Sequence, residues 1–375
     1  MNFKPIAILL LVCLVMLSLI YTGPSLTYDD SNYLLFAHQI ANGNFDRLSN
    51  PYAYGWLLPL TIAVPIKLGL STSLPAQIEY ILIILFTYLI ARKVSKNESI
   101  AFCVGIIAAT SAFIVGYSSR ILPDLLIGLF ITMAVYFMLD NRHPFFIGTL
   151  FGIVAFVKLG ALPFAGIFFI ALLMLKNWNY ATWFILGVLL MLGIYLWSMN
   201  FATYLFQLYD TNQLALDHAT LLINVVTIFV LVTPVLYTLP HGAFWQIFPL
   251  GFLFDLGVIG AYVALLKKER QYYIWAFILI AGFIYLMFGT ESFSSYQPIT
   301  VVSRYFVIFV GPLAILCSRF LTGIYDFVRY RYSLLNAKII LSAIVTVAIL
   351  SQAPMLYYFH GQQPTYTGAP IINNG

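Results

Sequence analysis

Apolar runs long enough to cross a lipid bilayer recur along almost the whole chain of 375 residues. A helix needs about 20 mostly apolar residues to span the hydrocarbon core, where only helices and closed barrels satisfy the backbone. Hydrophobic residues make up 62% of the chain and charged residues only 8%. The pattern predicts an all-α polytopic membrane protein with a single domain, residues 1–375, and no soluble C-terminal domain.

Eleven segments have the composition of transmembrane helices, and two more are apolar but interrupted by prolines. These two, 55–70 and 219–240, are expected to lie at the outer surface or to re-enter the membrane there. The first lies in an outer loop with interfacial helices over residues 22–75, the second in a large, partly re-entrant stretch over 200–246. The spans are predicted at 5–21, 76–92, 99–117, 124–140, 144–159, 160–175, 180–199, 247–266, 272–289, 304–321 and 335–352.

The basic residues set the expected orientation. With Lys4 inside and both interrupted segments outside, most of the 18 basic residues fall on the inner side. This agrees with the positive-inside rule. Because these residues lie in short loops between spans, the net charge of +5 indicates membrane topology and not nucleic-acid binding.

Two adjacent carboxylates, Asp29 and Asp30, follow the first span of a chain that is poor in acidic residues. Like charges this close repel, which favours protonation of one of them or the binding of a cation. A short helix is expected to follow and to lie along the membrane surface, with Asp30 or Ser31 as its cap. A solvated turn after a helix is the alternative interpretation of the pair.

Charged residues of both signs are expected at the outer ends of other spans. A charge in the hydrocarbon costs about 2.5–3.5 kcal/mol on insertion scales, so such residues usually face a wet cavity or a partner. Each residue alone is also explained as the mark of a helix end. Together they predict a polar site at the outer face, with contributions from Arg120, Asp124, Lys158, Glu291 and Arg304.

In order and spacing these features resemble the GT-C superfamily of membrane glycosyltransferases. Within it, they are most similar to the branch of the protein O-mannosyltransferases and lipid A aminoarabinose transferases. That branch usually carries Asp-Glu just past its first span, where this chain has Asp29-Asp30. The Trp-Trp-Asp motif of the oligosaccharyltransferase branch does not occur in this sequence. Further similar stretches are residues 119–124, 148–160 and 303–312.

The resemblance implies a glycosyltransferase that moves a hexosyl or pentosyl unit from a dolichyl- or undecaprenyl-type phosphate lipid. The acceptor would be a hydroxyl of a lipid, glycan or protein at the outer face. A mannosyltransferase-like role in cell-envelope glycosylation, in the plasma membrane of a prokaryote, fits this expectation. Its other partners would be membrane lipids.

The resemblance also implies roles for the acidic residues. An acceptor hydroxyl must lose its proton to a base within hydrogen-bond reach, and Asp29 matches the family's first acidic position. Asp30 and Asp124 would orient the acceptor or hold a divalent metal ion, the one cofactor that remains open.

The donor phosphate calls for fixed cations in a site of low dielectric constant. Arg304 is the first candidate, because a guanidinium group binds phosphate in a bidentate fork. Lys158 and Arg120 are second candidates. The expected substrate-binding residues are Tyr28, Tyr33 and Glu291.

Two other functions stay open. A transporter or flippase would be expected to show internal repeats with broken helices paired between its halves. Broken segments are present at 55–70 and 219–240, but the sequence has no second copy of Tyr28-Asp29-Asp30. A polymerase or ligase of lipid-linked glycans would share both the lipid donor and the outward-facing site.

Overall fold

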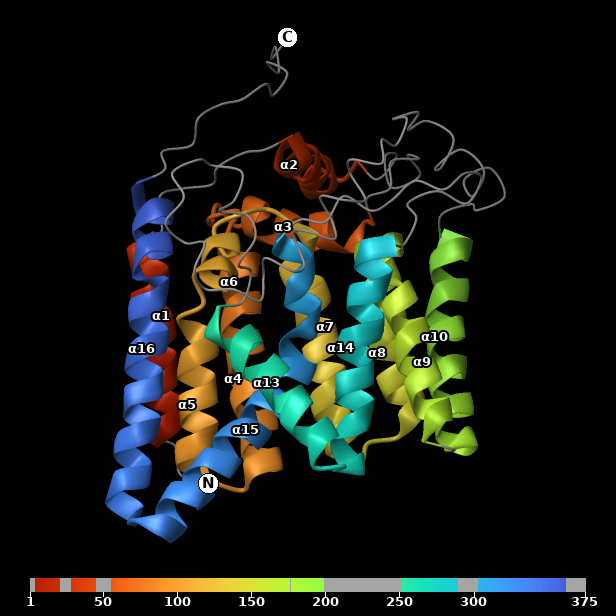
Figure 1. Cartoon of the computed structure of the whole chain (residues 1–375). Coiled ribbons are helices and arrows are strands. Elements are labelled where there is room, and N and C mark those ends of the chain that lie inside the picture. The colour runs from red at the N-terminus through yellow and green to blue at the C-terminus, as the bar shows by residue number, and fades with distance from the viewer. Residues whose placement is uncertain are drawn as a thin grey trace.

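The computed structural model describes residues 4–20, 28–44, 55–175, 177–198, 251–288 and 303–361, and the regular structure in these ranges is helical. Figure 1 shows upright helices packed side by side, with α2 and α3 lying across one end of the bundle. We call this end the α2/α3 end. In chain order the first helices are α1 (Lys4–Ile20), α2 (Tyr28–Ala41), α3 (Leu57–Lys67), α4 (Leu74–Ser95), α5 (Glu98–Ala109), α6 (Ala112–Tyr117), α7 (Pro123–Leu139) and α8 (Pro144–Val157).

The remaining elements complete the bundle. Four stretches in the described part, in α4, in α10, across η6 and α15, and in α16, are long and apolar enough to cross a membrane. Shorter apolar helices of 10–17 residues accompany them. The elements after α8 are η2 (Leu159–Ala161), α9 (Pro163–Met174), α10 (Trp178–Ser198), α13 (Phe252–Leu266), α14 (Arg270–Phe288), η6 (Ser303–Phe309), α15 (Val310–Arg331) and α16 (Leu334–Gly361).

Prolines fix where several of these helices begin. Pro123, Pro144 and Pro163 are the first residues of α7, α8 and α9. Proline is well suited to this position, because its fixed φ is helical and its missing N–H would have no partner within the helix. These three starts lie close to the predicted beginnings of spans at 124, 144 and 160.

The predicted span 99–117 differs from the structure, which breaks it into α5 and α6. Thr110 ends α5, and its hydroxyl donates a hydrogen bond to the carbonyl oxygen of Ile106 at 2.9 Å. At the start of α6, the N–H of Ala112 donates to Oε1 of the buried Gln352 from α16 at 3.1 Å. The break is therefore stabilised by a residue 240 positions away, which the hydropathy of the segment does not reveal.

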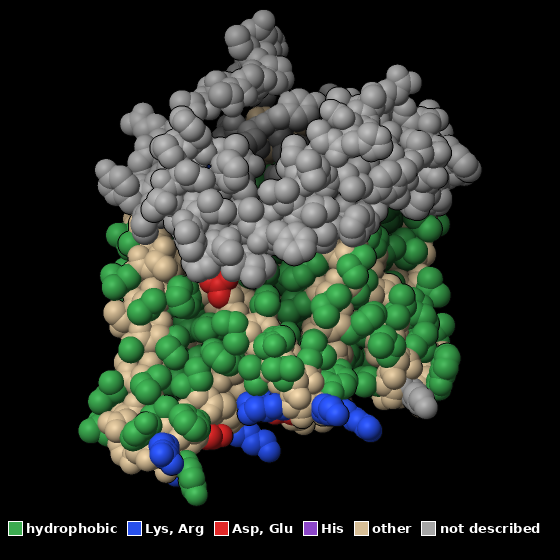
Figure 2. All heavy atoms as spheres, in the orientation of Figure 1, with side chains coloured by type: hydrophobic (Ala, Val, Ile, Leu, Met, Phe, Trp, Pro, Cys, Tyr) green, Lys and Arg blue, Asp and Glu red, His purple; other side chains and the backbone are tan. Residues whose placement is uncertain are grey.

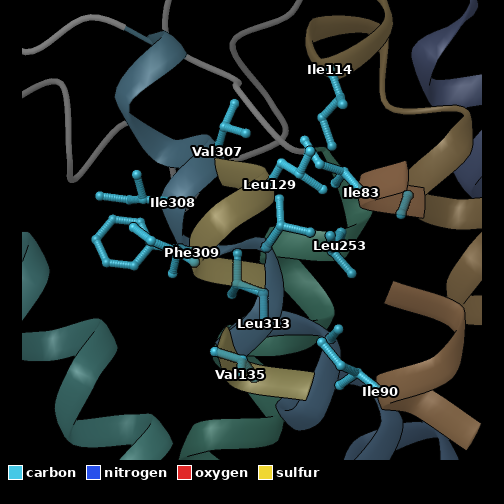
Figure 3. Packing of buried hydrophobic residues seen from close by; sticks show 14 of the residues in the cluster. Ile83, Ile90, Ile114, Leu129, Val135, Leu253, Val307, Ile308, Phe309 and Leu313 are labelled. Atoms are coloured by element: carbon cyan, nitrogen blue, oxygen red, sulfur yellow. The ribbon is translucent and has the colours of Figure 1, made fainter. Parts of the chain in front are cut away.

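The core lies where α4, α7, α13 and α15 meet. Figure 3 shows side chains from these helices in contact, together with residues of η6 and α6. They are aliphatic and aromatic side chains that fill the space between helices at close packing. The labelled members are Ile83, Ile90, Ile114, Leu129, Val135, Leu253, Val307, Ile308, Phe309 and Leu313.

Glycines allow two pairs of helices to approach closely. A methyl group on Gly148 of α8 would lie 1.9 Å from the carbonyl oxygen of Phe184 in α10. One on Gly260 of α13 would lie 2.1 Å from the carbonyl oxygen of Leu316 in α15. Small residues at such contacts are typical of membrane helices, whose association depends on close packing.

Basic residues gather at the end of the bundle opposite α2 and α3, which we call the basic end (Figure 2). Several of them pair with carboxylates across helix ends. Arg92 lies 3.2 Å from Glu98, and Asp140 pairs with both Lys93 and Arg142. The hydrogen bond from Lys93 lowers the pKa of the half-buried Asp140 carboxyl below its usual value. Arg319 of α15 pairs with Glu269 in the turn between α13 and α14.

Gly148→Ala is expected to lower the free energy of unfolding by about 1–3 kcal/mol, because overpacking at a helix contact costs that much. Gly166→Ala in α9 is the matched control. Nothing lies within 4 Å of its added methyl group, so it should leave stability unchanged or raise it slightly. Thermal unfolding midpoints in one detergent would measure both. Equal shifts for the two variants would contradict the close contact between α8 and α10.

Candidate functional site

Asp30 connects the surface helix α2 to the helical bundle through a hydrogen bond. Its side chain is 0% exposed, and its Oδ1 accepts a hydrogen bond from the backbone N–H of Ile121 at 2.9 Å. The predicted cap is wrong, because α2 begins at Tyr28 and includes Asp30 and Ser31 in its first turn. The carboxylate of Asp30 therefore serves a contact between distant segments and does not cap its own helix.

The N–H of Ile121 is available because the chain leaves the helical conformation between α6 and α7. Turns at Ser118 and Arg120 end α6, and Leu122 is extended (φ −125°, ψ 147°) because Pro123 follows it. A buried backbone donor needs a partner, and Asp30 supplies it. The local sequence thus creates the donor that fixes the acidic end of α2.

Asp124 lies immediately beyond this segment. It is in the first turn of α7 and is 4% exposed. A carboxylate in the first turn of a helix is stabilised by the helix dipole. Because Asp124 is three residues from Ile121, the hydrogen bond of Ile121 brings the first turns of α2 and α7 together.

Lys158 brings a cation to the same end. It follows α8 in an extended conformation (φ −160°, ψ 115°), so the backbone turns away from the helix there. Its Nζ lies 3.4 Å from the hydroxyl of Tyr305 and 4.9 Å from the centroid of that ring. A cation over an aromatic face is attracted by the ring quadrupole. Lys158 is thereby joined to η6, in which Tyr305 follows Arg304.

The middle of η6, at Val307, lies beside α7. A methyl group on Gly128 would be 2.4 Å from Cγ1 of Val307, so these two backbones pass close to each other. Figure 1 shows the blue ribbon that leads into α15 beginning beside α3, and Figure 3 shows Val307 of η6 close to Leu129 of α7. Asp124 is one helical turn before Gly128, and Arg304 is one turn before Val307. The starts of α7 and η6 therefore lie at the same place in the bundle.

Gly55 fixes the start of α3 over the end of α8. Its N–H donates to the carbonyl oxygen of Val157 at 3.2 Å, and a methyl group there would lie 2.0 Å from the carbonyl oxygen of Phe156. The ring of Trp56 then meets Phe156 edge-on at 5.3 Å. This contact places α3 beside the α8–η2 junction that carries Lys158.

The structure describes the other predicted site residues to different extents. Tyr33 is 1% exposed in α2, and Arg120 is half-buried in the segment between α6 and α7. For Tyr28, Asp29 and Arg304 the structure describes the backbone, at the starts of α2 and η6. Glu291 lies outside the described residues.

Metal ligands were expected at Asp30 and Asp124. One oxygen of Asp30 already accepts the hydrogen bond from Ile121. Within the described part of the chain, no group of three His, Cys, Asp or Glu side chains is arranged to hold a metal ion.

Two residues, Tyr305 and Glu79, were not predicted from the sequence. Tyr305 lies in the stretch 303–312 that resembles the GT-C family, but nothing in the sequence indicates that its side chain meets Lys158. Glu79 is 4% exposed in α4, and its Oε2 has no hydrogen-bond partner among the described residues. Glu79 and Ile83 are one turn apart on the same buried face of α4. Glu79 could have been singled out because an acidic residue inside an apolar span is rare and often functional.

The described helices define a polytopic membrane protein whose buried acidic groups and Lys158 gather at one end. Its fold is similar to that of ArnT from Cupriavidus metallidurans, a GT-C lipid A aminoarabinose transferase. The crystal structure of ArnT bound to undecaprenyl phosphate matches with a TM-score of 0.64 at 13% identity, covering 96% of this chain and 76% of that one. The apo state matches with a TM-score of 0.63 at 14% identity, covering 95% and 75%.

No protein-family model and no curated protein matches the chain. The structural likeness confirms the predicted all-α, GT-C-like fold over nearly the whole chain. At 13–14% identity it concerns the fold alone, and a fold does not define an activity.

Asp30→Ala is expected to lower the free energy of unfolding by about 1–3 kcal/mol, because the N–H of Ile121 would lose its buried acceptor. Asp30→Asn keeps an oxygen in the same place and should lose less. Thermal unfolding of both variants in the same detergent measures the difference. If the asparagine variant is as unstable as the alanine variant, the hydrogen bond is not what stabilises this contact.

Proposed function

We propose that this protein is an integral-membrane glycosyltransferase that moves a sugar from a polyprenyl-phosphate lipid to an acceptor hydroxyl at its α2/α3 end. The observation that carries the proposal is the meeting of four segments there: the first turns of α2, α7 and η6, and the α8–η2 junction. They bring Asp30, Asp124 and Lys158 to one end, with the backbones of Asp29 and Arg304. The undecaprenyl phosphate bound by ArnT, which has a similar fold, supports a lipid of this class as the donor.

The distribution of charge supports an outward-facing site. Basic residues gather at the opposite end of the bundle (Figure 2), and the positive-inside rule assigns such an end to the cytoplasm. The α2/α3 end then lies outside. We place the protein in the plasma membrane of a prokaryote.

Asp29 is the proposed base. The acceptor oxygen bonds to the anomeric carbon of the sugar, and the bond from that carbon to the donor phosphate breaks. The proton of the hydroxyl passes to the carboxylate of Asp29, and polyprenyl phosphate leaves with its negative charge. Asp30 has an oxygen engaged by the N–H of Ile121, which favours Asp29 for this step. Asp124 would orient the acceptor.

Cations would stabilise the negative charge on the departing phosphate. Lys158 is half-buried and positioned by Tyr305, so little reorganisation is needed when the phosphate arrives. Arg304 adjoins Tyr305 in the chain and would add a bidentate contact. Arg120 is a further candidate, while Tyr28, Tyr33 and Glu291 would contact the sugar or the acceptor.

Asp29→Asn is expected to reduce transfer of radiolabelled sugar from a polyprenyl-phosphate donor by about 10²- to 10⁴-fold, the usual contribution of a general base. Asp30→Asn should reduce transfer less. The assay needs a panel of donor sugars with membrane extracts as acceptors, and unfolding midpoints as a control for folding. Full activity of Asp29→Asn would remove its role as base. Transfer of a preassembled glycan but of no single sugar would identify a polymerase or ligase instead.

Lys158→Met is expected to weaken binding of undecaprenyl phosphate by about tenfold to a hundredfold, the value of one charge-assisted contact. Arg304→Ala should act in the same direction and weaken donor binding more than acceptor binding. Lys67→Met is the matched control, since Lys67 is an exposed lysine at the end of α3. Titration of a fluorescent polyprenyl phosphate measures all three. Equal losses for Lys67→Met and Lys158→Met would contradict a phosphate site at Lys158.

A further inference from the structure

The corner between α15 and α16 is a well-defined turn at the basic end, far from the candidate site (Figure 1). α15 ends at Arg331 and α16 begins at Leu334. The N–H of Tyr332 donates to the carbonyl oxygen of Val328 at 2.9 Å. The side chain of Ser333 accepts from the N–H of Asn336 at 3.1 Å. These bonds close α15 and cap α16, so the backbone of the turn has a defined course.

The last turns of α15 have one face in the core and one outside. Leu321, Tyr325 and Val328 are buried. Phe327 and Tyr330, at helical spacing on the other side, are 66% and 94% exposed. Such exposed aromatic side chains in a membrane protein are typical of the level of the lipid headgroups.

Three cations lie close to these aromatic residues in the chain. Arg329, Arg331 and Lys338 are exposed, and none of them forms an ion pair with a carboxylate of the described residues. Four other cations at this end, Arg92, Lys93, Arg142 and Arg319, have acidic partners, whereas Lys96, like the three at the corner, forms no ion pair with a described carboxylate. The described corner has one acidic residue nearby, Asp326, so it carries an excess of positive charge.

An apolar surface continues from the corner along α16. Leu335 and Ile339 are 66% and 55% exposed, as expected of side chains that face lipid. The cations therefore lie where the apolar surface ends, at the depth of phosphate groups in a bilayer. Arginine binds phosphate through its planar fork, and lysine and arginine are attracted to anionic lipid surfaces. A soluble anion would account for the cations but not for the exposed rings beside them.

We infer that Phe327, Arg329, Tyr330, Arg331, Tyr332 and Lys338 form a binding site for an anionic phospholipid headgroup, in the leaflet opposite the candidate site. The rings lie among the headgroups, and the cations contact the phosphate and a second negative charge of the lipid. This site is independent of the proposed transfer reaction. It would hold the end of α15, whose other end continues into η6.

The test is native mass spectrometry of the full chain in detergent with equal amounts of phosphatidylglycerol and phosphatidylcholine. The unchanged protein is expected to retain phosphatidylglycerol in preference. Arg331→Gln should lower the ratio of the two lipids about fivefold, and Arg329→Gln/Arg331→Gln further, at about 1 kcal/mol for each cation near the surface. Lys96→Gln is the matched control, because Lys96 is an exposed, unpaired cation at the same end, beyond α4.

Equal retention of both lipids by the unchanged protein would overturn the inference. So would an unchanged ratio in the double variant, or the same loss with Lys96→Gln as with Arg331→Gln. Unfolding midpoints in detergent without lipid control for folding. If the double variant is unstable, the comparison of the single variants Arg331→Gln and Lys96→Gln decides the question.

Discussion

A buried backbone N–H must find an acceptor, and in this protein that requirement fixes the position of the α2/α3 end. Pro123 starts α7 and leaves Ile121 outside any helix, so its N–H depends on Asp30. A carboxylate from the first turn of α2 thereby couples a surface helix to the bundle. α2 packs on α3, and Gly55 joins the start of α3 to the end of α8. One turn between two helices therefore determines how the covering helices lie over the candidate site.

The second determinant is η6, a segment of 3₁₀-helix that enters the core before α15 begins. Its hydrogen bonds are weaker than those of an α-helix, and side-chain packing has to compensate for this. The ring of Phe309 lies 5.0 Å from Phe283 and 5.7 Å from Phe164, and Val307 fits against Gly128. With the lower part of η6 held in this way, Tyr305 has a fixed position from which to meet Lys158. Rigid apolar packing thus positions a polar group that lies above it.

The sequence predicted the features that depend on local composition. Apolar runs predicted the class of fold and placed the starts of α7, α8 and α9 near residues 124, 144 and 160, and the acidic pair marked α2. The features that it missed depend on partners far away in the chain. The break after Thr110 is supported by Gln352, and Lys158 meets a tyrosine 147 residues later. The expected cap at Asp30 failed for the same reason, since a carboxylate suited to cap its own helix was engaged by a distant N–H. Which group a polar side chain binds depends on the backbone N–H donors that the folded bundle leaves without other partners.

The Asp-Asp pair, where the resembling family usually has Asp-Glu, is explained by this engagement. Asp30 is fully buried, and its oxygen reaches the N–H of Ile121 at 2.9 Å. A glutamate is one methylene longer and would need space that the close packing around Asp30 does not offer, unless α2 moved outward. A displaced α2 would also carry residue 29 away from the start of α7. An aspartate at position 30 therefore allows α2 to lie closer to the bundle than a glutamate would. The position of Asp29 thus depends on the length of the side chain next to it.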